Sequence, residues 1–207
     1  MQALPIATRR RCEAMIRTKL VDQECELKSI LALQAANLRR NLAEEEAARE
    51  GFLTAEYELD YLRRMNQSEP SVVAVDGDRI VGYALAATQA IRHGNPLLAD
   101  LFRQIDPLDF RGKLLREVPY VVVGQLCIAK GYRGIGLVGQ IYGHFRRSMQ
   151  GRYQCAVTDV ARSNVRSLKA HWRMGFRTVH SISFDGLEWE VVLWNWNDSE
   201  LSDSVGS

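Results

Sequence analysis

The sequence of 207 residues lacks several features that would assign it to a class at once. It has no apolar run as long as a membrane span, and its beginning lacks the uninterrupted apolar core of a secretory signal. Its four cysteines show neither metal-ligand spacing nor the density of a disulfide framework, which favours a reducing, cytoplasmic setting. The formal net charge is only +2, so no global basic field indicates nucleic acid as a partner.

The sequence also lacks internal repeats and any linker that would divide it. Its 46% hydrophobic content suits one domain with a substantial core. Residues 1–13 show no periodic pattern and are predicted to be a loose extension. Residues 198–207 are acidic and rich in serine, which predicts a disordered tail. We therefore expect a single domain over residues 14–197.

Within that domain, the hydrophobic periods alternate between those of helices and those of strands. Helices are expected after Asp22, from Asn41 to Gly51, over 55–65, from Asn95, over 136–149 and over 164–174. Strands are expected over 14–21, 119–129 and 153–160, with hairpins at 71–86 and 177–196. This order predicts a mixed α/β fold with helices on the faces of one sheet.

The turn at residues 130–139, Lys-Gly-Tyr-Arg-Gly-Ile-Gly-Leu-Val-Gly, lies between an expected buried strand and an expected helix. A helix N-terminus presents unpaired N–H groups and a positive dipole end to an anion. Gly134 and Gly136 let the backbone close around phosphate oxygens, and Arg133 adds a cation. No Gly-Lys-Ser/Thr follows, and the dinucleotide spacing lacks its acidic partner, so neither of those motifs is matched. By itself, the turn is either an anion site or a tight packing turn.

The expected helix at 164–174 carries two neighbouring stripes. One is apolar, begins at Val165 with spacing i, i+3, i+7, and should face the core. The other lies one residue earlier and consists of Asn164, Ser167 and His171. In an isolated helix, these three would be read as a cap, a small surface serine and a boundary histidine.

Together, these two segments resemble the GNAT superfamily of acetyltransferases. That family places Arg-Gly-x-Gly-x-Gly/Ala at a helix start and Asn-x-x-Ala-x-x-x-Tyr-x-x-x-Gly-Phe further along the chain. Residues 133–138 and 164–176 correspond to the two motifs. Val138 replaces the usual Gly or Ala, Ser167 replaces Ala, and His171 replaces Tyr. The order of the flanking elements also fits.

The resemblance implies a central mixed, mostly antiparallel sheet of about seven strands with helices on both faces. It also implies acetyl-CoA as the acyl donor. The diphosphate would rest on backbone N–H groups at the helix start, and the pantetheine arm would pair with the strand edge like an added strand. The residues implied for the cofactor are Leu126, Cys127, Ile128, Arg133, Gly134, Ile135, Gly136, Leu137, Val138, Asn164 and Ser167.

The implied chemistry is direct attack of a primary amine, on a small molecule or a peptide, on the thioester. We predict that the backbone N–H of Ile128, or one beside it on a splayed strand, stabilises the oxyanion. His171 is predicted to donate a proton to the sulfur in place of Tyr. Gln125 stands where many family members have Glu, and a neutral amide cannot act as the base. Water chains and four carboxylates stay open for that role: Glu117, Asp159, Glu188 and Glu190.

Two other classes of function stay open. The same residues suit a non-catalytic acyl-CoA-binding sensor or regulatory module, or a nucleotide-binding domain that uses the glycine turn. The acceptor amine is not identified, because its contacts would come from the N-terminal helices and the insertion at 92–115. The sequence also leaves a homodimer open.

Overall fold

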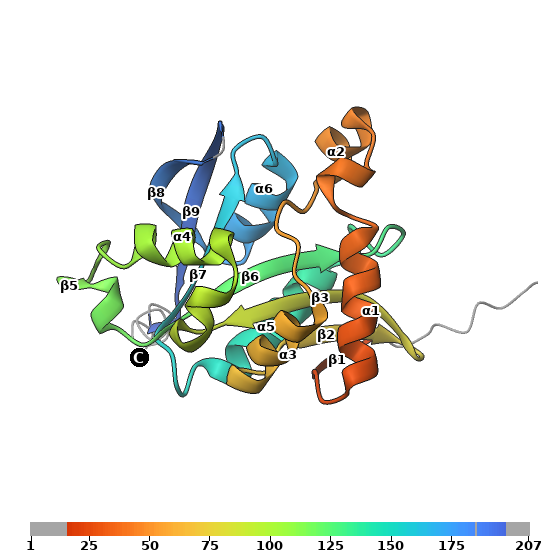
Figure 1. Ribbon diagram of the computed structural model, residues 1–207, viewed down its shortest axis with the longest axis horizontal. Helices are drawn as coiled ribbons and strands as arrows, with labels where there is room; N and C mark the ends of the chain where they lie inside the picture. The colour runs from red at the N-terminus through yellow and green to blue at the C-terminus, as the bar shows by residue number, and fades with distance from the viewer. Residues whose placement is uncertain (1–15, 185, 198–207) are drawn as a thin grey trace, which may run out of the picture.

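The computed structural model describes residues 16–184 and 186–197, so both predicted terminal extensions lie outside the described residues. Seven strands form one sheet in the order β1-β2-β3-β6-β7-β9-β8, and only the β6–β7 pair is parallel (Figure 1). These strands are β1 (Arg17–Leu20), β2 (Val72–Asp76), β3 (Arg79–Ala87), β6 (Tyr120–Ile128), β7 (Cys155–Ala161), β8 (Arg177–Phe184) and β9 (Leu187–Asn195). The predicted fold class is confirmed.

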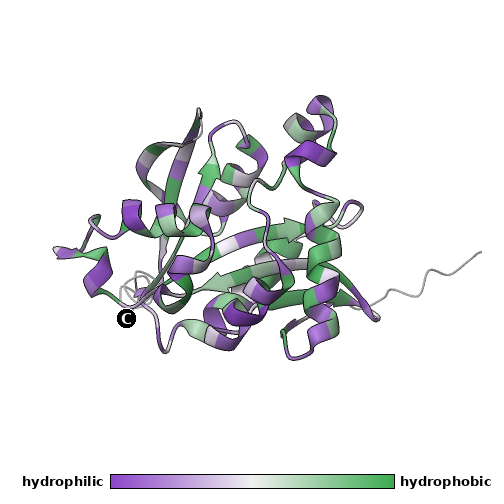
Figure 2. Ribbon diagram, in the orientation of Figure 1, coloured by the Kyte–Doolittle hydropathy of each residue, from purple (hydrophilic) through white to green (hydrophobic). Residues whose placement is uncertain are grey.

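Helices cover both faces of this sheet (Figure 1). The first face carries α1 (Glu24–Ala35), α3 (Leu59–Ser68) and α4 (Pro96–Ile105), and the second carries α5 (Leu137–Met149) and α6 (Val165–Arg173). Because side chains alternate along a strand, each face has its own core. The central strands β2, β3 and β6 are therefore largely hydrophobic along their length, whereas β1 and β8 carry more polar residues (Figure 2). None of the helices in the described part of the chain is long and apolar enough to cross a bilayer.

Most of the predicted elements are confirmed, but two helix starts are wrong. The helix expected from Asn41 is α2 (Glu44–Glu50), because Asn41 lies in a 3-10 turn and donates its side-chain N–H to the Ala35 carbonyl at 2.7 Å. Gly51 ends this helix as predicted, with φ of 79°. The helix expected from residue 55 begins only at Leu59. A short hairpin, β4 (Asp109–Phe110) with β5 (Lys113–Leu114), was not predicted.

The late start of α3 leaves residues 52–58 mostly extended, and hydrogen bonds to distant elements hold them there. The Asn164 side-chain N–H donates to the Phe52 carbonyl at 3.2 Å, and the Gln125 side-chain N–H donates to the Ala55 carbonyl at 2.7 Å. The Gln34 side chain bonds both backbone groups of Tyr57, at 3.0 and 3.1 Å. We name residues 52–58 the crossing segment, because it links the N-terminal region to β6 and α6.

Candidate active site

The two parallel strands of the sheet separate part of the way along. Residues 120–122 of β6 pair with residues 155–157 of β7, and no pairing follows beyond them. The Thr158 hydroxyl donates to the Val123 carbonyl at 2.8 Å where the strands part. The backbone of β6 that follows has no β7 partner, so it can pair with an extended ligand.

The direction of these free backbone groups follows from one hydrogen bond. The N–H of Ala129 donates to the Val81 carbonyl on the neighbouring β3 side at 2.8 Å. Successive residues of a strand point their N–H groups to opposite sides, so Ile128 and Leu126 face the gap between β6 and β7. Two N–H donors are therefore aimed into the gap.

A groove with a cavity volume of about 520 Å³ runs from this gap to the start of α5. All the residues implied for the cofactor line it except Ile135, which is 55% exposed. Gly134 and Gly136 both have φ of 82°, in the left-handed region that favours glycine. A Cβ atom at either position would meet no protein atom within 4 Å, so the space beside them is open to a ligand. The N-terminus of α5 points its free N–H groups there, which suits an anion.

The sequence predicts that Arg133 adds a cation beside the phosphate-binding turn, but in the structure its side chain bonds to other parts of the protein. The Arg133 side chain donates to the Ile128 carbonyl at 3.0 Å, to Glu50 at 3.3 Å, and to the Asn37 side chain. Its charge is therefore held by protein groups, and it ties α2 to the end of β6. Arg166 and Arg173 also line the groove on its α6 side, and Arg166 pairs with the same Glu50 carboxylate at 2.8 Å.

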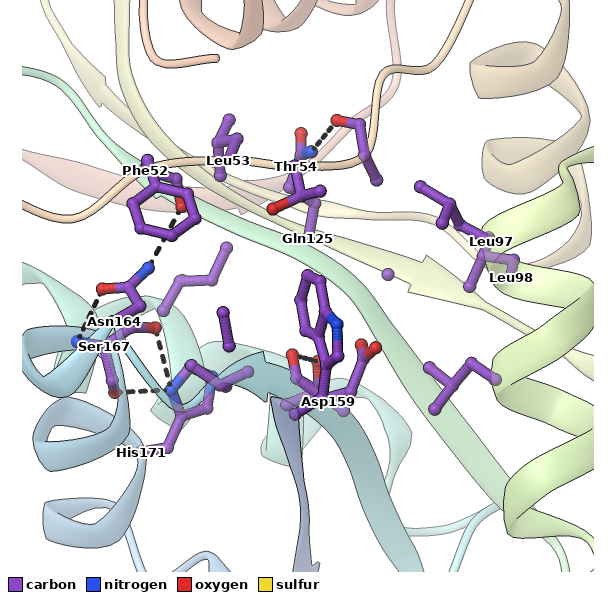
Figure 3. Close-up of a pocket in the computed structure, with 18 of the residues that line it drawn as sticks. Phe52, Leu53, Thr54, Leu97, Leu98, Gln125, Asp159, Asn164, Ser167 and His171 are labelled. Carbon is purple, nitrogen blue, oxygen red and sulfur yellow. Dashed lines mark hydrogen bonds between the residues drawn. The ribbon is translucent and has the colours of Figure 1, made fainter. Parts of the chain in front are cut away.

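A second cavity, of about 100 Å³, lies beside the groove and is lined along one side by the crossing segment (Figure 3). It shares five lining residues with the groove: Phe52, Leu53, Leu126, Asn164 and Ser167. An acyl group carried in the groove would enter the second cavity at this shared wall. We name this second cavity the acceptor pocket.

The N–H groups of Leu126 and Ile128 are the two candidates for the oxyanion donor, and the two residues differ in which cavities they line. Leu126 lines both cavities, whereas Ile128 lines only the groove. A β-bulge sits just before Leu126, where the pairing of β3 with β6 skips Gly124. Of the two N–H groups that face the gap, that of Leu126 therefore belongs to the residue that borders both cavities.

Of the four carboxylates considered from the sequence, only Asp159 lines the acceptor pocket. It projects from β7 toward the cavity (Figure 3), and burial, aided by the negative charge of Asp100, raises its pKa to about 6. The other three are engaged elsewhere. Glu117 accepts the N–H of Leu114 at 3.3 Å, Glu188 accepts the hydroxyl of Ser183, and Glu190 pairs with Arg162.

Two further polar side chains are excluded from proton or acyl transfer. The Gln125 side chain accepts the Tyr83 hydroxyl at 2.6 Å and donates to the crossing segment, so it is a structural clamp. Burial raises the pKa of the Cys127 thiol to about 12. At neutral pH this thiol is not a thiolate, so it does not form an acyl-enzyme.

His171 lines the acceptor pocket but is only 2% exposed. Its Nδ1 lies 2.8 Å from the carbonyl oxygen of Ser167, which can only accept, so the proton is on Nδ1. Its Nε2 then accepts the hydroxyl of Tyr142 at 2.7 Å. Burial lowers the pKa of His171 to about 4. The charged, proton-donating state predicted from the sequence is therefore disfavoured, and both ring nitrogens already have partners.

We expect His171→Gln to keep turnover within a few-fold of wild type, whereas a lost proton donor costs about a hundredfold or more. It should destabilise the fold at pH 7, since a buried hydrogen-bonded side chain is replaced. That destabilisation should shrink by about 2 to 3 kcal/mol between pH 6.5 and 4.5, because only the wild-type unfolded state gains a histidine proton there. Urea unfolding of both proteins across this range measures it. A hundredfold loss of turnover in a folded variant would restore the catalytic role.

Comparisons with known proteins agree with this geometry. A family model described as the acetyltransferase (GNAT) family matches residues 36–176. No curated protein sequence matches the chain significantly. Among solved structures, the NatC complex bound to Gag peptide and CoA has 15% identity and a TM-score of 0.60, covering 87% of this chain and 98% of that one. NAA60 of Arabidopsis thaliana with acetyl-CoA has 14% identity and a TM-score of 0.60, covering 87% and 99%. A ribosomal-protein-alanine N-acetyltransferase from Brucella melitensis has 15% identity and a TM-score of 0.54, covering 86% and 98%.

Proposed function

Since the chain belongs to the GNAT family of acetyltransferases, which use acetyl-CoA as acyl donor, we propose that it acetylates a primary amine by direct attack. The observation that carries the proposal is the shared wall between the two cavities. The groove suits the cofactor, since it has a helix N-terminus at one end and open strand edge along its length. The acceptor pocket holds a carboxylate with a raised pKa where the amine would arrive.

In the proposed reaction, the thioester lies beside Leu126 and Ser167, with its carbonyl oxygen on the N–H of Leu126. The amine enters from the acceptor pocket and attacks the carbonyl carbon. Its nitrogen becomes strongly acidic as the bond forms, and Asp159 takes the proton. A pKa near the working pH suits such a base. The tetrahedral intermediate then expels the CoA thiolate.

The leaving group needs little help from an acid. A thiol has a reference pKa of about 8.5, so its thiolate leaves far more readily than an amine anion would. The Ser167 hydroxyl, on the shared wall, is the side-chain donor available to it. We propose that His171 holds the last turns of α6 in place through its bonds to Ser167 and Tyr142, without transferring a proton.

Release of free CoA thiol from acetyl-CoA, measured with a panel of primary amines, tests this function. Amine-dependent release is the expected result, with an acetylated amine of matching mass as product. A protein that binds acetyl-CoA in calorimetry but releases no thiol with any amine would instead be a sensor or regulatory module. Tight binding of ATP with no binding of desulfo-CoA would favour the nucleotide-binding alternative.

A further inference from the structure

The acceptor pocket contains two carboxylates and no cationic side chain. Besides Asp159, it is lined by Asp100 from α4, whose side chain is only 12% exposed. None of the lining residues is Lys or Arg, and the only His is His171, which is neutral as described above. Burial and, to a smaller extent, the negative charge of Asp100 disfavour the charged form of Asp159. The pocket is therefore suited to positively charged groups.

The only cation that pairs with Asp100 among the described residues is Arg103, one turn further along α4. The Arg103 side chain is 75% exposed, so it reaches Asp100 from solvent and is not part of the pocket wall. Exposed pairs of this kind contribute little to stability, so a ligand ammonium can replace Arg103 at small cost. Asp100 is thus open to a bound cation from the pocket side.

The two carboxylates come from different sides of the pocket. The shared wall with the groove includes Asn164 and Ser167 at the start of α6, and α4 lies on the opposite side of the cavity (Figure 3). Asp159 lies between them, on β7 (Figure 3). An acceptor that places its amine at the shared wall, beside Asp159, therefore directs its other end toward α4 and Asp100.

Much of the remaining wall is apolar. It includes Leu97, Leu98, Leu101, Ile182 and Trp189, beside the polar side chains of Thr54, Gln125 and Thr158. An unbranched chain of methylene groups can pack along the apolar side chains.

From this placement, and resting on the proposed function, we propose that the acceptor is an aliphatic diamine. One amine enters in its neutral form, after its ammonium proton is lost to solvent, and attacks the thioester carbon. As the amide bond forms, the nitrogen passes its proton to Asp159, the thioester bond breaks, and the CoA thiolate leaves and is protonated by solvent. The second ammonium stays charged and binds Asp100. The methylene chain between them packs on the leucine and tryptophan side chains of the wall.

The test compares cadaverine with pentylamine, which has the same chain but a neutral end. The wild-type protein should acetylate cadaverine with a kcat/KM at least tenfold higher. Asp100→Asn should remove this preference by raising KM for cadaverine at least tenfold more than KM for pentylamine. Asp78→Asn, in the exposed turn between β2 and β3, removes the same charge outside the pocket and should change nothing.

Two more acceptors separate this proposal from its alternatives: Nα-acetyl-lysine amide and a lysine-free peptide with a free α-amine. A higher kcat/KM for either than for cadaverine would overturn the diamine and point to a protein acceptor. Equal values for cadaverine and pentylamine, or equal losses for both in Asp100→Asn, would also overturn it. In each of these cases the acetyltransferase function stands. If none of the four amines releases CoA thiol, the proposed function itself fails.

Discussion

Asp159→Asn is expected to lower kcat by roughly a hundredfold to ten-thousandfold, which is the usual cost of losing a general base. The amide has nearly the same shape as the carboxylate but cannot accept the proton of the attacking amine. The substitution leaves the groove unchanged, so the affinity for acetyl-CoA should stay within about twofold of wild type. Thiol release and calorimetry measure the two quantities separately.

The pH dependence adds a second signature. Since the base must be deprotonated, the kcat/KM of wild type should rise with pH through an apparent pKa of about 6. The residual kcat/KM of Asp159→Asn should not show this rise with pH through about 6. Glu117→Gln removes a carboxylate that was an equal candidate from the sequence but lies outside the acceptor pocket, and it should keep the wild-type profile.

A measurement of stability tests whether Asp159→Asn loses activity because it is less well folded. Because burial raises the folded-state pKa of Asp159, the group stabilises the fold in acid, and this contribution is lost as the pH rises through about 6. At pH 7 the Asn variant should therefore be as stable as wild type, or more stable by up to about 3 kcal/mol. An inactive variant that is also more stable would be inactive for a chemical reason. An active one would contradict the assignment of the base.

The parts of the candidate site that the sequence indicates are local in sequence. The glycine turn and the stripe of Asn164, Ser167 and His171 each lie within one or two turns of a helix, where spacing alone decides which side chains share a face. Gly134, Gly136, Asn164 and Ser167 line one groove in the structure, whereas His171 lines only the acceptor pocket and Ile135 is exposed. The sheet of about seven strands was implied by the resemblance to the GNAT superfamily; its central strands are continuous apolar runs, whereas β1 and β8 are not.

The parts that the sequence does not reveal depend on partners far away along the chain. Residues 55–58 look helical by pattern, yet the crossing segment is extended because Gln125 and Asn164 bond its carbonyls from positions 70 and 112 residues away. Asp100 and Asp159 belong to separate elements, and nothing in their local sequence marks them as neighbours. The protonation state of His171 depends on its burial against Tyr142, which no spacing rule supplies.

Gly136→Asp is expected to weaken binding of acetyl-CoA at least tenfold, which is about 1.4 kcal/mol. The new side chain enters the open space beside the N-terminus of α5, where the diphosphate is expected, and its negative charge repels the phosphates. Its own carboxylate would also occupy the free N–H groups of the helix, as an N-cap aspartate does. Steric exclusion, repulsion and competition for these donors therefore all act in the same direction. Calorimetric titration with CoA and acetyl-CoA gives the loss of affinity directly.

The control for this prediction lies in the same turn. Gly131 has φ of 90° and, like Gly136, no protein atom within 4 Å of an added Cβ, but it does not line the groove. Gly131→Asp therefore introduces the same charge and a similar backbone strain, on the order of 1 kcal/mol, without entering the expected phosphate position. If both variants lose affinity equally, strain in the turn explains the effect and the diphosphate site lies elsewhere. If only Gly136→Asp loses affinity for acetyl-CoA, the diphosphate binds at the first turn of α5. The two variants are matched in charge and backbone strain and differ only in position.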